Sequence, residues 1–64
     1  MKIFGQRMRE EREKQGMSQD DLAKAIGTSK QVLSRYETGQ RTPRVDMALM
    51  IATALHVELT ALLN

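Results

Sequence analysis

One glycine separates two short segments that each carry the apolar spacing of a helix. An apolar stripe at residues 22–26 precedes Gly27, and Leu33 and Tyr36 repeat at i and i+3 after it. A connection this short does not allow two helices to lie antiparallel, so we expect them to cross at a steep angle. The middle of the chain is therefore predicted to hold two short helices set across one another.

Such a pair is a helix-turn-helix, and residues that begin and end helices place it at about residues 18–37. Ser18 is a good cap residue, and Asp21 follows three positions later. Gly27 permits the positive backbone angle of the turn, and residues 28–29 offer a cap for the second helix.

The remaining boundaries predict an all-α fold, a compact bundle of four to five short helices. Gly16 ends a first helix whose apolar face holds Phe4 and Met8. The Thr42-Pro43 pair suits a cap followed by the first position of a helix, because proline has no amide hydrogen to lose there. The first helix is expected to end at about residue 15 and the second at about residue 26. The remaining helices are expected at about residues 30–37, 45–55 and 57–63.

Length and composition bound the fold. The 64 residues make a single domain, predicted to span residues 1–64, and contain no cysteine for disulfides or thiolate metal sites. No run approaches the roughly 18 apolar residues of a membrane span. The N-terminus also lacks the apolar stretch of a signal peptide. We therefore expect a cytoplasmic protein with no membrane partner.

No feature of the sequence indicates an enzyme, a cofactor, a metal site or a small-molecule ligand. The only histidine, His56, is isolated, and no glycine-rich loop is present to cradle a phosphate. The paired acids at residues 10–11 and 20–21 are neighbours in sequence rather than facing residues. They are better explained as solvated charges or as charges that favour a helix dipole.

Positive charge is concentrated in the first two-thirds of the chain. All ten lysine and arginine residues lie in residues 1–44 beside six acids, which leaves a net charge of +4 there. Residues 45–64 hold only Asp46 and Glu58, a net charge of −2. This distribution is consistent with a polyanionic partner, although mixed charges also simply solvate helices.

The helix-turn-helix resembles that of phage lambda repressor and Cro-like proteins, also called the XRE family. Five residues stand at that family's characteristic positions: Gln19, Ala23, Gly27, Leu33 and Tyr36. The surrounding strings MSQDDLA at 17–23 and LSRYETG at 33–39 look like the same family, and the match covers nearly the whole chain. The resemblance implies a lambda repressor-like fold and double-stranded DNA as the partner.

The resemblance also implies which residues read the bases. In this family the second helix of the motif enters the major groove, and its N-terminal residues reach base edges. Carried over by position, the recognition helix is 30–37, with Lys30, Gln31 and Arg35 as base readers and Ser34 as a fourth. Lys and Arg can donate to guanine, and Gln can pair with adenine. The competing interpretation is an ordinary solvated helix face.

Contacts to the DNA backbone are implied in the same way. Gln19 opens the first helix of the motif, where free amides and the helix dipole favour a phosphate. Ser29 and the loop residues Arg41 and Arg44 are further candidates, since Arg suits bidentate phosphate contact. Exposed loop arginines are also often inert. Ser18 is assigned to capping alone.

Arg12 and Glu37 are assigned to stability. The family commonly pairs an arginine of the first helix with the glutamate that closes the recognition helix, so the resemblance implies a structural ion pair. Its expected role is to orient the third helix against the first.

Two positions depart from the family's pattern. Glu11 falls on the apolar stripe of the first helix, so either it lies at the rim beside a basic residue or this helix packs less well. His56 stands where a helix usually ends with glycine, and a left-handed backbone is expected there.

The last third of the chain is more apolar than a core requires. The fourth helix is expected to face the core with Val45, Ala48, Leu49, Ala52 and Leu55. Apolar residues outside that face predict a contact surface for a second subunit or a missing segment. This surface is predicted to include Met47, Met50, Leu59, Leu62 and Leu63. Alternatively, Met47 covers the core edge and Met50 is a singly exposed apolar residue.

Together these features predict the DNA-binding domain of a transcriptional regulator that represses by occupying a promoter. A homodimer on a palindromic operator would place its recognition helices about 34 Å apart. One alternative is an antitoxin that binds a toxin as well as its own operator, through the exposed methionines. Another is a protein-interaction module that has lost DNA binding, which would require an acidic or neutral recognition face.

Overall fold

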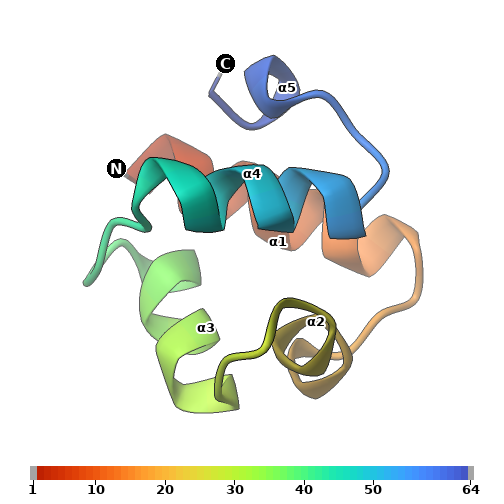
Figure 1. Ribbon diagram of the computed structural model, residues 1–64, viewed down its shortest axis with the longest axis vertical. Coiled ribbons are helices and arrows are strands. Elements are labelled where there is room, and N and C mark those ends of the chain that lie inside the picture. Colours follow the sequence, from red (N-terminus) through yellow and green to blue (C-terminus); the bar gives the residue numbers. More distant parts are fainter. Residues whose placement is uncertain (1, 64) are drawn as a thin grey trace.

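The computed structural model describes residues 2–63, and within them the chain forms helices and no strands (Figure 1). The helices are α1 (Lys2–Lys14), α2 (Gln19–Ile26), α3 (Lys30–Thr38), α4 (Val45–Ala54) and α5 (Leu59–Leu63). The prediction of an all-α fold with four to five short helices is confirmed. No helix within the described range is long and apolar enough to cross a membrane.

The helices of the motif cross steeply, as the short connection requires. Figure 1 shows α2 almost end-on while α3 runs in the plane of the view, with both at the opposite end of the molecule from α5. Helix α1 packs against α3 and α5, and α4 packs against α2 and α5. Helix α3 packs against both α1 and α2.

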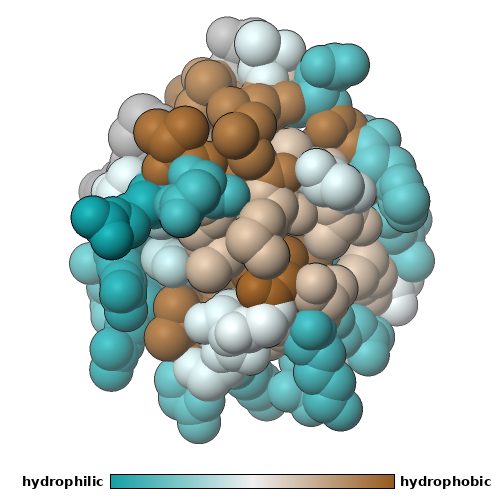
Figure 2. Space-filling model, viewed as in Figure 1, coloured by the Kyte–Doolittle hydropathy of each residue, from teal (hydrophilic) through white to brown (hydrophobic). Residues whose placement is uncertain are grey.

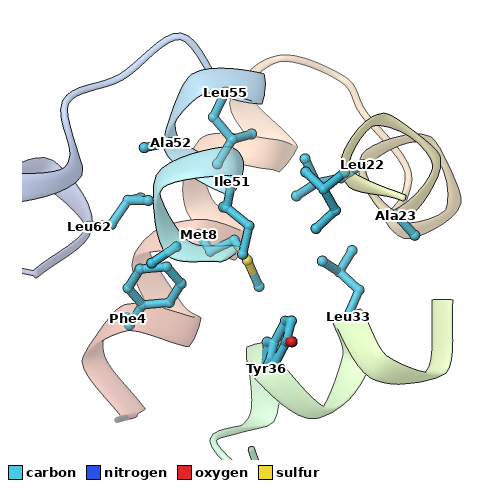
Figure 3. Close-up of a cluster of buried hydrophobic side chains, with 12 residues drawn as sticks. Phe4, Met8, Leu22, Ala23, Leu33, Tyr36, Ile51, Ala52, Leu55 and Leu62 are labelled. Carbon is cyan, nitrogen blue, oxygen red and sulfur yellow. The ribbon is translucent and has the colours of Figure 1, made fainter. Parts of the chain in front are cut away.

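A single apolar core joins all the helices (Figure 3). Phe4 and Met8 of α1 point toward Leu33 and Tyr36 of α3 and Ile51 of α4. The other core residues come from α2, α4 and α5 and the residue after α4: Leu22, Ala23, Ile26, Ala48, Ala52, Leu55 and Leu62. Leu33 and Tyr36, the two apolar residues whose spacing predicted this helix, thus lie in the core and anchor α3.

The predicted core face of α4 was wrong at two positions. Val45 and Leu49 are 74% and 49% exposed, whereas Ile51 is completely buried. The buried stripe is residues 48, 51, 52 and 55, which has the i, i+3, i+4, i+7 spacing of one helix face. Because α4 is apolar on nearly all sides, its own periodicity did not fix which side turns inward.

Local hydrogen bonds set the start of α2 as the sequence predicted. The Ser18 hydroxyl accepts the Asp21 amide N–H at 3.0 Å, and the Asp21 carboxylate accepts the Ser18 amide N–H at 3.0 Å. These bonds form a capping box and lower the pKa of Asp21, chiefly through the backbone N–H of Ser18. Gly27 closes the helix in the left-handed conformation, with φ 74°.

The predicted cap of α4 was also wrong. The helix begins at Val45, two residues later than Pro43 at its first position would require, and Arg44 stands at the N-cap without a side-chain cap bond. In the first turn, the Asp46 carboxylate instead accepts the Met47 amide N–H at 2.9 Å. This carboxylate supplies the negative charge that the positive end of the helix dipole favours.

Two departures from the family's pattern have clear structural outcomes. Glu11 lies at the rim of the core, where its carboxylate pairs with Lys14 at 3.2 Å. His56 adopts the expected left-handed backbone, with φ 58°. Just before it, the Leu55 carbonyl accepts a hydrogen bond from the Gln15 side chain at 2.6 Å, which ties the end of α1 to the end of α4.

Candidate nucleic-acid interface

Helix α3 turns a polar face outward from an anchored apolar back. Lys30, Gln31 and Arg35 are exposed and Ser34 is partly buried. Their positions at i, i+1, i+4 and i+5 place these four side chains on one side of the helix. The structure therefore brings together all four predicted base readers on one accessible surface.

The ends of α3 are fixed by its own caps. The Ser29 hydroxyl accepts the Val32 amide N–H at 3.2 Å. Since a hydroxyl can accept and donate at once, its hydrogen can still be donated to a phosphate. Gly39 ends the helix in the left-handed conformation, with φ 79°. The exposed residues of α3 thus lie on a helix of fixed length and orientation.

The loop after α3 carries two of the four predicted phosphate contacts, Arg41 and Arg44. The Arg41 guanidinium lies 6.0 Å from the centroid of the Tyr36 ring, within cation–π range, and the Arg41 amide N–H donates to the Arg35 carbonyl at 3.2 Å. Arg44 is exposed immediately before α4. Both guanidinium groups thus belong to the segment that directly follows α3.

Ion pairing divides the basic residues into two groups. On α1 and α2, each cation whose side chain the structure describes has an acidic partner within 4.0 Å. The cations of α3 and its following loop, Lys30, Arg35, Arg41 and Arg44, have no acidic partner among the described residues. The unneutralised positive charge is therefore gathered on α3 and the loop that follows it.

Behind this surface, a buried polar network connects α1, α2 and α3. Arg12 Nε donates to Glu37 Oε2 at 2.7 Å, and Arg12 Nη2 donates to Glu37 Oε1 at 3.3 Å. Arg12 Nη1 donates to the Met17 carbonyl at 2.7 Å. The side chains of Arg12 and Glu37 are only 9% and 2% exposed. The two residues expected to form a structural ion pair are thus in bidentate contact, with α1 held to α3.

Gln19 joins the same network, a contact that the sequence analysis missed. Its Nε2 donates to Glu37 Oε1 at 3.0 Å, and its side chain is partly buried at the first position of α2. One of its two amide hydrogens is therefore already used within the protein. The other leaves Gln19 able to donate to a phosphate at the start of α2.

The predicted contact surface of the last third is only partly exposed. Met50 and Leu63 are 48% and 43% exposed, whereas Met47 and Leu59 are half-buried and pack against the core. Leu62 is completely buried, so its assignment to this surface was wrong. It faces inward because α5 uses this residue to cover α1 and α4.

The chain's relatives share this architecture. Residues 8–62 match the family described as helix-turn-helix. The chain belongs to this helix-turn-helix family. The relatives matched are described as a transcriptional regulatory protein and a controller protein rather than as enzymes, in agreement with the prediction that the chain is not an enzyme.

Solved structures of this family superpose on the chain closely. The restriction-modification controller protein C.AhdI from Aeromonas hydrophila is 41% identical, with a TM-score of 0.88 over 92% of this chain and 86% of that one. SinR, a regulator of biofilm formation known from Bacillus subtilis, was solved in complex with DNA. It is 30% identical, with a TM-score of 0.89 over 97% of this chain and all of that one.

The relatives known from sequence are much longer proteins. A predicted HTH-type transcriptional regulatory protein of Methanocaldococcus jannaschii is 41% identical over 59 residues, which is 92% of this chain. That match covers 19% of the relative, and a similar protein of Pyrococcus furiosus is matched over 16% of its length. The chain thus spans less than a fifth of these archaeal relatives.

Proposed function

We propose that this chain binds double-stranded DNA as part of a transcriptional regulator and reads the major groove with α3. The observation that carries the proposal is the division of charge: the cations without acidic partners gather on α3 and its following loop. DNA offers about one negative charge per 1.7 Å of its axis to such a surface. The structural similarity to SinR, which was solved with DNA, supports the same partner.

Each residue of the surface has a proposed role. Lys30 and Arg35 donate to guanine, and Gln31 pairs with adenine, because their donors and acceptors match the major-groove edges of these bases. Ser34 is partly buried and contributes a fourth contact through its short side chain. The phosphate contacts, which fix orientation rather than sequence, are Gln19, Ser29, Arg41 and Arg44.

The salt dependence of DNA affinity tests the phosphate contacts. Each contact that displaces a counterion adds about 0.9 to the slope of log K against log salt concentration. We expect the paired change Arg41→Ala and Arg44→Ala to reduce this slope by about 2, measured by fluorescence anisotropy on a mixed-sequence duplex. The control removes the same charge from α1 through Arg9→Ala and Lys14→Ala. Equal slopes for the two double variants would contradict the proposal.

An interaction module without DNA binding fits the surface less well. Such a module would require a neutral or acidic recognition face, and the exposed face of α3 carries Lys30 and Arg35 unneutralised. The matched relatives also carry regulatory or controller names. DNA binding is therefore the function that the site supports best.

The protein is further proposed to bind a palindromic operator as a homodimer and to repress by occupying a promoter. Apolar surface gathers over α4 and α5, whereas the end that carries α2 and α3 is mostly hydrophilic (Figure 2). The exposed apolar residues of α4 and α5 are Val45, Leu49, Met50 and Leu63. Val45 and Leu49 are one turn apart on α4, so the surface is continuous along that helix.

Sedimentation of the protein with and without an operator duplex tests the homodimer. We expect two protein copies per duplex for the parent and one for Leu49→Glu, because a buried charge opposes apolar association. Gln6→Glu, an equal change on the exposed side of α1, should leave two copies bound. A single copy per duplex for the parent would exclude this homodimer, and transcription from a reporter with that operator would then show whether occupancy represses.

A further inference from the structure

The Gln19 amide is held by a group that can only accept hydrogen bonds. Glu37 Oε1 receives Gln19 Nε2 at 3.0 Å, and the Glu37 side chain is 2% exposed. An ionised carboxylate has no hydrogen to donate, so it can bind the nitrogen of the amide but not its oxygen. Glu37 therefore fixes which end of the Gln19 amide faces it, and with that the direction of the remaining N–H.

Arg12 makes this arrangement compatible with a nearby anion. A carboxylate close to the start of α2 would repel a phosphate that approaches the same helix end. Arg12 pairs with both oxygens of Glu37, at 2.7 and 3.3 Å, and so neutralises its charge where solvent cannot. The third Arg12 bond, to the Met17 carbonyl at 2.7 Å, anchors the guanidinium beside the turn that leads into α2.

We propose that Glu37 is a positioning residue for DNA binding, which orients the Gln19 amide toward a phosphate of the DNA backbone. This inference rests on the proposed function, since it assigns how one of its phosphate contacts is organised. It gives the buried pair of Arg12 and Glu37 a role beyond stability. The recognition helix, which carries Glu37, and the phosphate contact at α2 are thereby coupled through one hydrogen bond.

The chemistry predicts a specific effect of Glu37→Gln. The new amide has nearly the same shape but can accept or donate, so both orientations of the Gln19 amide become possible. The hydrogen bond from Gln19 to a charged phosphate is then no longer preorganised. We expect DNA binding to weaken about tenfold, the loss typical of one hydrogen bond to a charged group.

A double-mutant cycle in DNA affinity tests the coupling. The dissociation constants of the parent, Gln19→Ala, Glu37→Gln and the double variant are measured on one duplex by fluorescence anisotropy, at a temperature where circular dichroism shows all four folded. Each single variant should bind about tenfold more weakly, and the double variant no more weakly than Gln19→Ala. The proposal is overturned if Glu37→Gln binds like the parent. It is also overturned if the double variant is weakened by the full product of the two single-variant factors.

Two further variants separate positioning from stability. Ile51→Val lowers stability in the core, away from the DNA-facing surface, and should leave the dissociation constant unchanged. If Glu37→Gln does not fold, Gln19→Asn replaces it, because the shorter amide cannot reach Glu37 and a phosphate together. Parent-like binding by Gln19→Asn would overturn the proposal. Failure of the parent itself to bind DNA would instead refute the proposed function.

Discussion

Gly5 is the position where the structure most clearly reverses an expectation from helix propensity. It lies inside α1, where replacing glycine with alanine ordinarily stabilises a helix by about 1 kcal/mol. A Cβ atom at Gly5, however, would meet the Tyr36 carbonyl oxygen and lie 2.7 Å from the Glu37 carbonyl oxygen. Both are backbone atoms of α3, so no flexible side chain can yield. Gly5→Ala can be accommodated only by moving α1 away from α3.

The magnitude follows from the two opposing terms. Overpacking a close contact costs about 1 to 3 kcal/mol and sometimes more, and here the backbone must shift. Because both obstructing atoms are backbone, we expect a cost in the upper part of this range, about 2 to 3 kcal/mol. After the propensity gain of about 1 kcal/mol is subtracted, Gly5→Ala should lower the free energy of unfolding by about 1 to 2 kcal/mol net. For a domain of this size, that corresponds to a fall in Tm of roughly 4 to 16 °C.

Thermal unfolding followed by circular dichroism measures this effect. The control is Gln6→Ala, an exposed position on the same helix, where Tm should change by only a few degrees. A Tm for Gly5→Ala equal to or above that of the parent would refute the close approach of α1 and α3.

Three further changes test other parts of the structure. Arg12→Ala leaves the Glu37 carboxylate buried without its ion-pair partner, so we expect the free energy of unfolding, measured by urea denaturation, to fall by about 3 to 5 kcal/mol. Arg9→Ala, which breaks an exposed ion pair, should lower it by less than about 1 kcal/mol. Asp21→Asn should cost stability at pH 7. Because the folded-state pKa of Asp21 lies below its ordinary value of 3.8, the difference in Tm from the parent should stay constant above pH 5 and shrink as pH falls through that lowered pKa. His56→Gly relieves a left-handed backbone at φ 58°, and Tm should rise by a few degrees; an unchanged or lower Tm would show that the histidine is not strained.

Features that depend on near neighbours in sequence were predictable. The start of α2 depends on Ser18 and Asp21, which are three residues apart, and its end depends on the backbone freedom of Gly27. The exposed face of α3 follows from the spacing of its apolar residues, Leu33 and Tyr36. These local rules located the helix-turn-helix and the exposed face of its second helix. The assignment of that face to base reading came from the resemblance to lambda repressor and Cro-like proteins.

Features that depend on distant contacts were not predictable in the same way. Gly5 meets α3 more than thirty residues along the chain, and Gln19 bonds to Glu37 across eighteen positions. The one available signal was the presence of a glycine inside a helix, which indicates either a weak helix or a close packing contact. For α4, an almost uniformly apolar helix gave no contrast from which to choose the buried face.

Selection of DNA from a pool of random duplexes tests the central claim, that α3 reads base sequence. The parent is compared with a triple variant at the exposed α3 face, Lys30→Ala, Gln31→Ala and Arg35→Ala. A matched control makes the same three residue changes on α1: Lys14→Ala, Gln6→Ala and Arg9→Ala. We expect the parent and the control to recover one shared sequence motif and the α3 variant to recover none. Recovery of that same motif by the α3 variant would contradict the assignment of α3 as the recognition helix.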